Sequence, residues 1–130
     1  MTADDFREIA LSMQDATEGA HMGHPDFRTA GRIFSTLHAD DEWGTVKLTP
    51  DEQRELMKMH PKVFVPASGA WGRDGWTNVR LDAATKKTVR SAMILAFQNV
   101  IEKSRAPRRS KSVSPSRKTR PARKRQIRRR

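Results

Sequence analysis

The chain has 130 residues and a formal net charge of +11 at pH 7, and it contains no cysteine. This length allows one domain with a modest hydrophobic core, and the lack of cysteine excludes disulfide bonds and thiolate chemistry. The positive charge is confined to one end, because residues 106–130 hold 12 of the 26 Lys and Arg and no Asp or Glu. Residues 1–105 therefore carry 14 basic against 15 acidic side chains, and long-range attraction for a polyanion should come from the C-terminal segment.

The N-terminal residues predict a short helix and give no sign of a secretory signal. Residues 1–5 are acidic, whereas a signal peptide begins with basic residues, and the longest apolar run, residues 92–97, is far too short to cross a bilayer. Thr2 followed by two aspartates is typical of a helix N-terminus, and Phe6 begins an apolar stripe. We expect a cytoplasmic protein that does not insert into a membrane.

The next part of the chain favours β structure. Glycine and proline residues interrupt any helical period over residues 16–32, which predicts one or two short strands joined by turns. Residues 32–38 form a β run that ends in an acidic turn at residues 39–42. Residues 43–48 form a further β run, with two faces defined by alternation: Val46 and Leu48 on one, and Trp43, Thr45 and Lys47 on the other.

The clearest local signal is a helix start at residues 49–52. Thr49 is suited to cap the helix, a proline occupies the first helical position, and Glu52 follows three residues after the cap. The helix should end near His60, because the proline after it disfavours helical geometry in the preceding residue. Residues 62–66 then predict a short strand at an edge of the sheet, since they end in another proline.

Residues 69–82 form the segment around which the rest of the sequence is organised. Glycines at every third position predict a tight loop with Arg73 at its tip. Residues 76–81 then alternate as a strand, with Trp76, Asn78 and Arg80 on one face. Asp82 is predicted to cap the last helix, in which apolar residues recur at helical spacing: Val89, Ala92, Met93, Ala96, Phe97, Val100 and Ile101.

The predicted order of elements is α-β-β-β-α-β-β-α, in which runs of strands replace the regular alternation of α/β proteins. This order indicates an α+β fold of two layers, with an antiparallel sheet of about five strands and helices on one face. The other face would then be exposed and, by alternation, would present Trp43, Thr45, Lys47, Trp76, Asn78 and Arg80.

Aromatic and basic side chains interleaved on an open sheet suit a nucleic acid strand, because the rings can stack on bases while the cations neutralise phosphates. The alternative is that the tryptophans only shield backbone hydrogen bonds or pack beneath a loop. The candidate contacts in the folded part of the chain are Trp43, Lys47, Arg73, Trp76 and Arg80.

Residues 106–130 predict a disordered tail, which leaves residues 1–105 as the folded domain. Only Val113 and Ile127 are sizeable apolar residues there, so apolar burial cannot offset the entropy of ordering the segment. Its cations would bind phosphates by displacing counterions, although a tail that serves only solubility is the alternative. The candidate tail contacts are Arg108, Arg109, Lys111, Arg117, Lys118, Arg120, Arg123, Lys124, Arg125, Arg128, Arg129 and Arg130.

Three separated segments give the sequence a resemblance to a known family. They read HPDFRTAGRIFSTL at residues 24–37, VKLTPDEQ at residues 46–53, and GAWGRDGW at residues 69–76 with VRLD at residues 79–82. Together they closely resemble the MmcQ/YjbR family over about residues 1–104, in the family's order. The resemblance implies a compact α+β fold, similar in outline to frataxin-like proteins, and DNA binding through a double-wing arrangement. It brings no set of catalytic residues, and the basic tail lies outside it.

Metal and catalytic chemistry find little support in the sequence. His21 and His24 could both reach one metal ion, but no third ligand follows at a recognisable spacing. The acidic turn at residues 39–42 lacks the alternating ligands of a calcium loop, and no Ser, His and Asp set has the spacing of a triad. We therefore expect no metal, no cofactor and no catalytic residue.

The sequence favours a non-enzymatic nucleic-acid-binding protein, with DNA preferred over RNA as its partner and a cytoplasmic, nucleoid-associated location. The tail would supply salt-sensitive affinity without reading the base sequence, because phosphate contacts carry no sequence information. The alternative is a protein-interaction or adaptor domain, which would bind a protein partner on the exposed sheet face and be localised by its basic tail.

Overall fold

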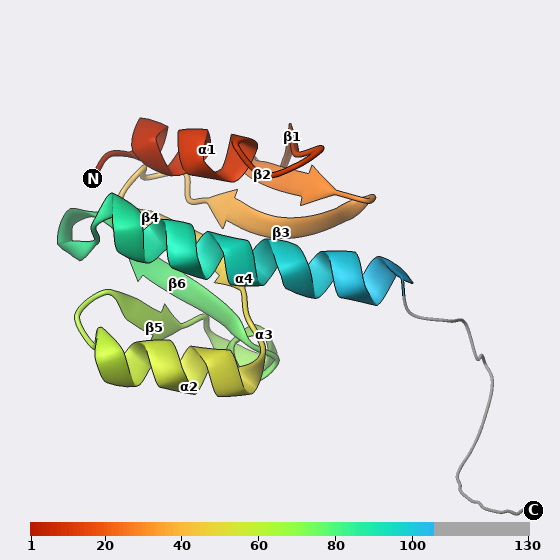
Figure 1. Ribbon diagram of the computed structural model, residues 1–130. Coiled ribbons are helices and arrows are strands. Elements are labelled where there is room, and N and C mark those ends of the chain that lie inside the picture. The colour runs from red at the N-terminus through yellow and green to blue at the C-terminus, as the bar shows by residue number, and fades with distance from the viewer. Residues whose placement is uncertain (106–130) are drawn as a thin grey trace, which may run out of the picture.

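The computed structural model describes residues 1–105 of the chain (Figure 1). The predicted tail and its twelve basic residues lie outside the described residues. The elements follow one another in the order α1 (Ala3–Leu11), β1 (Thr17–His21), β2 (His24–Thr29), β3 (Arg32–Leu37), β4 (Trp43–Lys47), α2 (Pro50–Met59), β5 (Phe64–Pro66), α3 (Gly69–Arg73), β6 (Trp76–Arg80), the 3-10 turn η1 (Leu81–Ala83) and α4 (Lys86–Arg105).

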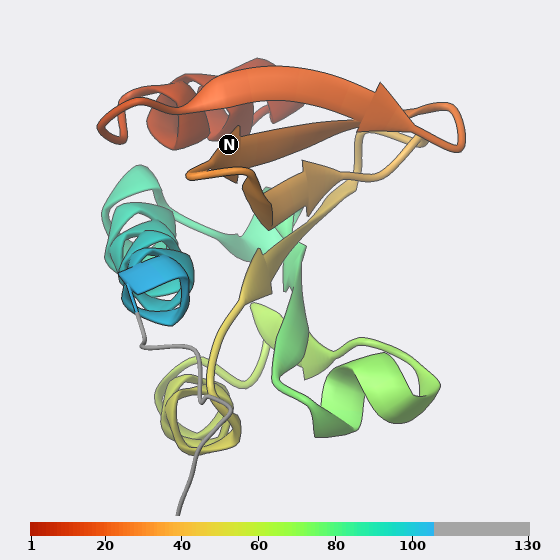
Figure 2. The same cartoon turned by 90° about the vertical axis from the view of Figure 1, so that its right-hand side faces the viewer.

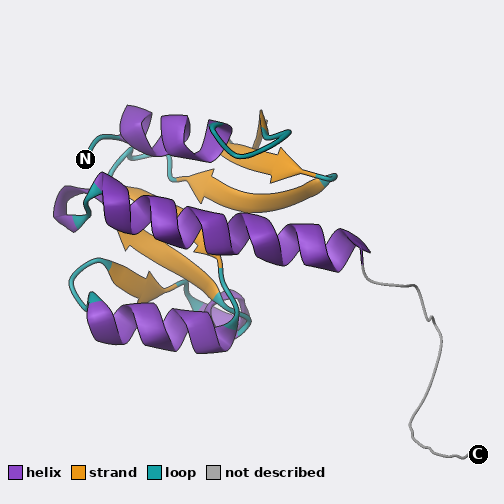
Figure 3. Ribbon diagram, in the orientation of Figure 1, coloured by secondary structure: helices purple, strands orange, loops and turns teal. Residues whose placement is uncertain are grey.

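The strands form a single antiparallel sheet in the order β1-β2-β3-β4-β6-β5 (Figure 3). The α+β class and the antiparallel pairing are as the sequence predicts. The sheet has six strands instead of about five, because the glycine-rich segment after α1 forms a full hairpin of two strands. The predicted short strand near residues 62–66 does lie at an edge, as β5 beside β6.

Three helices lie on one side of the sheet. In Figure 1, α4 runs across the sheet between α1 and α2, and both α1 and α4 pack on β3 and β4. The three predicted helices therefore share one face, as expected, but the sequence did not predict the additional short helix α3. This short helix lies on the opposite side of β6 from α4, as Figure 2 shows. We call the side of the sheet that faces away from α4 the open face.

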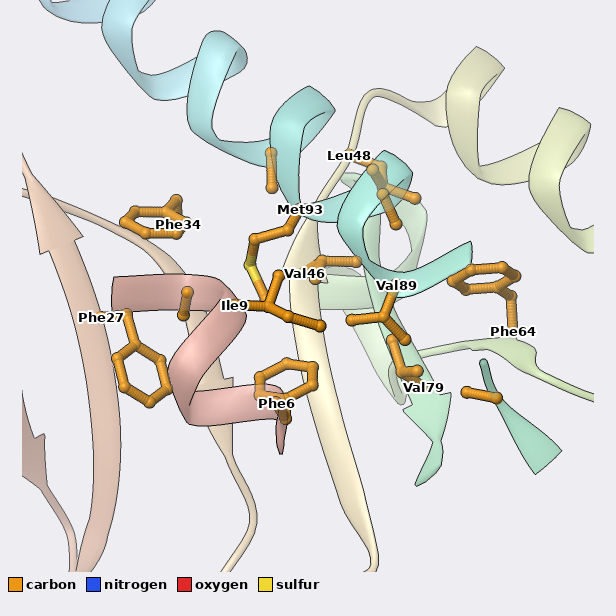
Figure 4. Packing of buried hydrophobic residues seen from close by; sticks show 14 of the residues in the cluster. Phe6, Ile9, Phe27, Phe34, Val46, Leu48, Phe64, Val79, Val89 and Met93 are labelled. Atoms are coloured by element: carbon orange, nitrogen blue, oxygen red, sulfur yellow. The ribbon is translucent and has the colours of Figure 1, made fainter. Parts of the chain in front are cut away.

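The hydrophobic core fills the space between the sheet and the helices α1 and α4. Phe6 and Ile9 come from α1, Val46 from β4, and Val89 and Met93 from α4, and all five are buried. Figure 4 shows these side chains converging from the three elements. Gly44 in β4 is required by this packing, because a Cβ there would lie 2.5 Å from the ring of Phe6.

Two helices begin with reciprocal hydrogen bonds, which the sequence predicts in full at Thr49 and only as a hydroxyl cap at Thr2. Thr49 Oγ1 accepts from the backbone N–H of Glu52, and the Glu52 carboxylate accepts from the N–H of Thr49. The same capping box joins Thr2 and Asp5 at the start of α1. Because each device uses residues only three apart, both helix starts could be located from the sequence.

Two local predictions within residues 69–86 are wrong. The predicted tight loop is the short helix α3, which begins at Gly69 and is followed by Gly75, and these two glycines have positive φ angles of 63° and 110°. The predicted cap at Asp82 is also incorrect, because this residue lies in the 3-10 turn η1. The last helix instead begins at Lys86, where Thr85 Oγ1 accepts a hydrogen bond from the N–H of Thr88.

No helix within residues 1–105 combines the length and the apolar character that crossing a bilayer requires.

Candidate functional site

The register between β4 and β6 sets the arrangement of side chains on the open face. Trp43 lies opposite Arg80 at one end of this ladder, and Lys47 lies opposite Trp76 at the other. Each cation lies over the tryptophan of the neighbouring strand: Arg80 Cζ is 4.6 Å from the Trp43 ring centroid, and Lys47 Nζ is 5.5 Å from that of Trp76. Both distances fall within the range of cation–π attraction.

A polar pair occupies the centre of the same ladder. Thr45 lies opposite Asn78, and its hydroxyl donates to Asn78 Oδ1 at 2.9 Å. His38 Nε2 lies 2.7 Å from the same hydroxyl oxygen. Since a hydroxyl has only one hydrogen, His38 Nε2 must be the donor in this contact. Burial lowers the pKa of His38, which favours its neutral form.

The helix α3 adds a third tryptophan beside the Lys47 end of the ladder. Trp71 packs edge-on against Trp76, with ring centroids 6.1 Å apart, and 67% of Trp71 is exposed. Lys47 Nζ also donates to the backbone carbonyl of Asp74 at 2.8 Å, which ties the end of α3 to β4. Arg73 and Asp74 line a shallow hollow with Trp71 and Ala70.

A buried carboxylate anchors the other half of the open face. Asp26 on β2 is fully buried, and it accepts hydrogen bonds from Arg28 Nε at 2.7 Å and Arg28 Nη2 at 3.0 Å. His21 Nδ1 lies 2.7 Å from Asp26 Oδ2. The Arg28 guanidinium, together with His21, holds the pKa of Asp26 below its usual value despite burial. An ionised carboxylate can only accept, so His21 Nδ1 carries the hydrogen of this bond.

A pocket with a volume of about 210 Å³ lies between these two groups of residues. Trp71 and Trp76 line one part of it, and the imidazoles of His21 and His24 line another. His24 Nδ1 is buried and has no hydrogen-bond partner among the described residues. We call this the open-face pocket, and its lining residues are His21, His24, Ile33, Thr36, Thr45, Ala67, Trp71 and Trp76.

The structure places the five candidate residues of the folded part on the open face or beside it, in two groups. Trp43 and Arg80 form one pair, while Lys47, Trp76 and Arg73 gather around α3. The two groups are about 13 Å apart, because four residues separate them along each strand at about 3.3 Å per residue.

Of the eight residues that line the pocket, sequence reasoning places only Thr45 and Trp76 on this face, and three of the others show why. Trp71 lies in the glycine-rich motif, but a predicted loop does not indicate where its side chain points. Thr36 could have been placed by alternation, since β3 pairs it with Thr45. His24 had been considered only as a metal ligand with His21. The two residues do lie opposite each other in the β1–β2 hairpin, with ring centroids 4.8 Å apart.

Within residues 1–105, no three His, Cys, Asp or Glu side chains are grouped as a metal site would require. The two imidazoles of the pocket therefore stand without a third ligand from the described part of the chain. The side chains of the site are suited to hydrogen bonding, stacking and cation–π contacts.

Comparisons with known proteins identify a family and a similar fold. The family model YjbR matches residues 11–98. The crystal structure of the Deinococcus radiodurans protein DR2400, a DUF419 domain, is similar with a TM-score of 0.70 and 18% sequence identity, over 81% of this chain and 82% of that one. At this identity the likeness establishes the fold and no activity. No curated protein matches the chain.

Proposed function

The chain belongs to the YjbR family, and on that premise we propose that it is a non-enzymatic protein that binds nucleic acid, with DNA as its partner. The observation that carries the proposal is the pairing of cations with tryptophans on the open face. Trp43 with Arg80 and Trp76 with Lys47 place two aromatic rings and two positive charges on one antiparallel ladder. This combination suits a strand whose bases stack and whose phosphates are anionic.

The two parts of the chain would contribute differently to binding. Residues 106–130 carry twelve Lys and Arg without an acid, so they would supply affinity that depends strongly on salt and weakly on sequence. Residues 1–105 carry 14 basic and 15 acidic side chains, so their contacts must be local. In this proposal the tail holds the protein near DNA, and the open face makes the contacts of short range. A cytoplasmic, nucleoid-associated location follows from such a role.

A protein-interaction domain is the second candidate function. Trp71, at 67% exposed, and Val65, at 40% exposed, are large apolar residues near one edge of the sheet, and the folded part has almost no net charge. Such a surface also suits a protein partner. Saturable binding of a protein that Trp76→Ala abolishes, together with no DNA binding by residues 1–105, would favour this candidate.

Titration of a labelled DNA duplex with the full chain at several salt concentrations tests the proposal. If about eight basic side chains contact phosphates, the slope of log affinity against log salt is roughly −7. Saturable binding with a steep negative slope is the expected result. Failure to bind duplex or single-stranded DNA at low salt would contradict the proposal.

A further inference from the structure

We propose that the open-face pocket holds one unpaired base of a nucleic acid. This inference rests on the proposed function and adds to it a ligand class, since it concerns a base outside the helical stack. The pocket has aromatic walls, a histidine with an unpartnered ring nitrogen and cations nearby, and these features suit the ring, the polar edge and the phosphates of a nucleotide.

The size of the pocket limits its occupant to a small ring system. Its volume of about 210 Å³ is below the roughly 300 Å³ at which pockets for drug-sized ligands begin. The side chains of Ile33 and Ala67 add apolar walls between the polar groups. A flat heterocycle of one or two rings suits this space better than an extended chain.

The tryptophans supply a surface on which such a ring can stack. Trp71 and Trp76 stand at an interplanar angle of 71°, so their rings form two walls of a corner. Trp71 is two-thirds exposed, which leaves much of its surface free for an incoming ring. Stacking of a base on an aromatic side chain typically contributes about tenfold to affinity.

One buried side-chain atom among the lining residues of the pocket has no hydrogen-bond partner in the described part of the chain. His21 Nδ1 is occupied by Asp26, and His38 Nε2 is occupied by Thr45. In contrast, His24 Nδ1 is buried without a partner among the described residues. The nitrogen has almost no exposed surface, so a ligand reaches it only if the His24 ring turns toward the pocket, and a partner supplied there would then offset the cost of burying it. The edge of a base offers both donors and acceptors, and it can therefore satisfy either tautomer of His24.

Two cations lie near the tryptophan walls of the pocket without lining it, and both could attract the phosphates that flank a bound base, although Lys47 Nζ also contacts Asp74. Lys47 Nζ lies 5.5 Å from the centroid of Trp76, a wall of the pocket. Arg73 lies two residues after Trp71, and both line the neighbouring hollow. A fully paired duplex cannot use the pocket, because its bases are stacked and their edges are paired. The pocket should therefore prefer DNA with an unpaired base.

Three DNA duplexes would test this inference with the full chain, and the first two have the same number of phosphates. One carries a single bulged adenine, the second an abasic bulge at the same position, and the third an extra base pair instead of the bulge. We expect the bulged adenine to bind about tenfold more tightly than the abasic bulge, with quenching of tryptophan fluorescence. Equal affinity for all three duplexes would overturn the pocket proposal and leave DNA binding intact. Binding to none would overturn the proposed function as well.

Two variants and one control assign the preference to the pocket. His24→Phe keeps a ring of similar size but removes Nδ1, and Trp71→Ala removes the stacking surface. Both should bring the affinity ratio of adenine bulge to abasic bulge close to one. His60→Phe is the control, because His60 follows α2 and packs on Phe64, and it should keep the ratio. If His24→Phe does not fold, Trp71→Ala still tests the proposal, because residue 71 is exposed and its replacement should not prevent folding. An unchanged ratio in the folded variants would overturn the proposal.

Discussion

Arg80 Cζ lies 4.6 Å from the centroid of the Trp43 ring, directly across the ladder between β4 and β6. The same ladder places Lys47 against Trp76. In this second pair the cation is on β4 and the ring on β6, the reverse of the first pair. Antiparallel register explains this symmetry, because the sequence places a tryptophan at the start of each strand and a cation four residues later. The open face therefore carries two aromatic and cationic pairs around the central polar pair of Thr45 and Asn78.

Replacing Arg80 tests whether its pair with Trp43 stabilises the fold. Arg80→Gln keeps much of the side chain but removes the charge, and it should lower the free energy of unfolding by about 0.5–1 kcal/mol. Urea denaturation measures this change. Arg90→Gln alters an exposed arginine on α4 and should leave stability unchanged. Equal effects of the two substitutions would show that the pair contributes nothing.

The buried carboxylate of Asp26 should make stability depend on acidic pH. Hydrogen bonds from Arg28, and then from His21, lower the pKa of Asp26 below 3.8 in the folded protein. The unfolded chain therefore takes up the proton first, so this contribution is complete above about pH 4 and declines as the pH falls below it. Asp26→Asn should cost roughly 1–3 kcal/mol at neutral pH and reduce the acid dependence. Urea titrations of the unsubstituted protein and of Asp26→Asn, each at neutral and at acidic pH, measure both effects. Equal loss of stability by the two proteins on acidification would refute the role given to Asp26.

The close approach of Gly72 to the preceding turn should make α3 intolerant of a larger residue. A Cβ at Gly72 would lie 1.9 Å from the carbonyl oxygen of Ala67, so Gly72→Ala forces the backbone to move. We expect a loss of about 1–3 kcal/mol in thermal or urea unfolding. Ser68→Ala is a matched control, because the Ser68 side chain makes no capping hydrogen bond at this helix. A fully stable Gly72→Ala protein would contradict the packing described for α3.

Arg73 should contribute one phosphate contact to DNA binding. Arg73→Gln is expected to make the slope of log affinity against log salt less negative by about one, with weaker binding to all sequences. Arg54→Gln is the control, because Arg54 is also exposed but lies on α2 and pairs with Asp51. If both substitutions changed the slope by the same amount, the open face would have no special role.

Local signals allowed much of the fold to be predicted from the sequence. The caps at Thr2 and Thr49 depend on residues three apart, and both formed as predicted. Alternation along residues 76–81 also placed Val79 and Leu81 in the core and Arg80 outside it. The glycine-rich motif misled the prediction for a physical reason. Gly72 is needed for close packing against Ala67 within a helix, whereas the pattern alone indicated a turn.

The pocket could not be predicted because its residues meet only through the sheet. Alternation could have placed Thr36 of β3 on the open face, but no sequence period links it to His24 of β2 or to Trp71 of α3. A bulge adds to the difficulty. Phe27 pairs with Ser35 and Arg28 with Ile33, so the alternation along β3 breaks at Phe34. The pairing of Arg28 with the buried Asp26 did leave a signal, since residues two apart on a strand share a face.

The central claim is that the open face of the folded domain binds nucleic acid, beyond what the basic tail does. The most direct measurement compares DNA binding by the full chain and by a chain that ends at Arg105, across a series of salt concentrations. We predict that residues 1–105 still bind DNA, with lower affinity and a much shallower slope of log affinity against log salt. Trp76→Ala should abolish this residual binding. Loss of all binding on removal of residues 106–130 would contradict the claim and leave the open face to a protein partner.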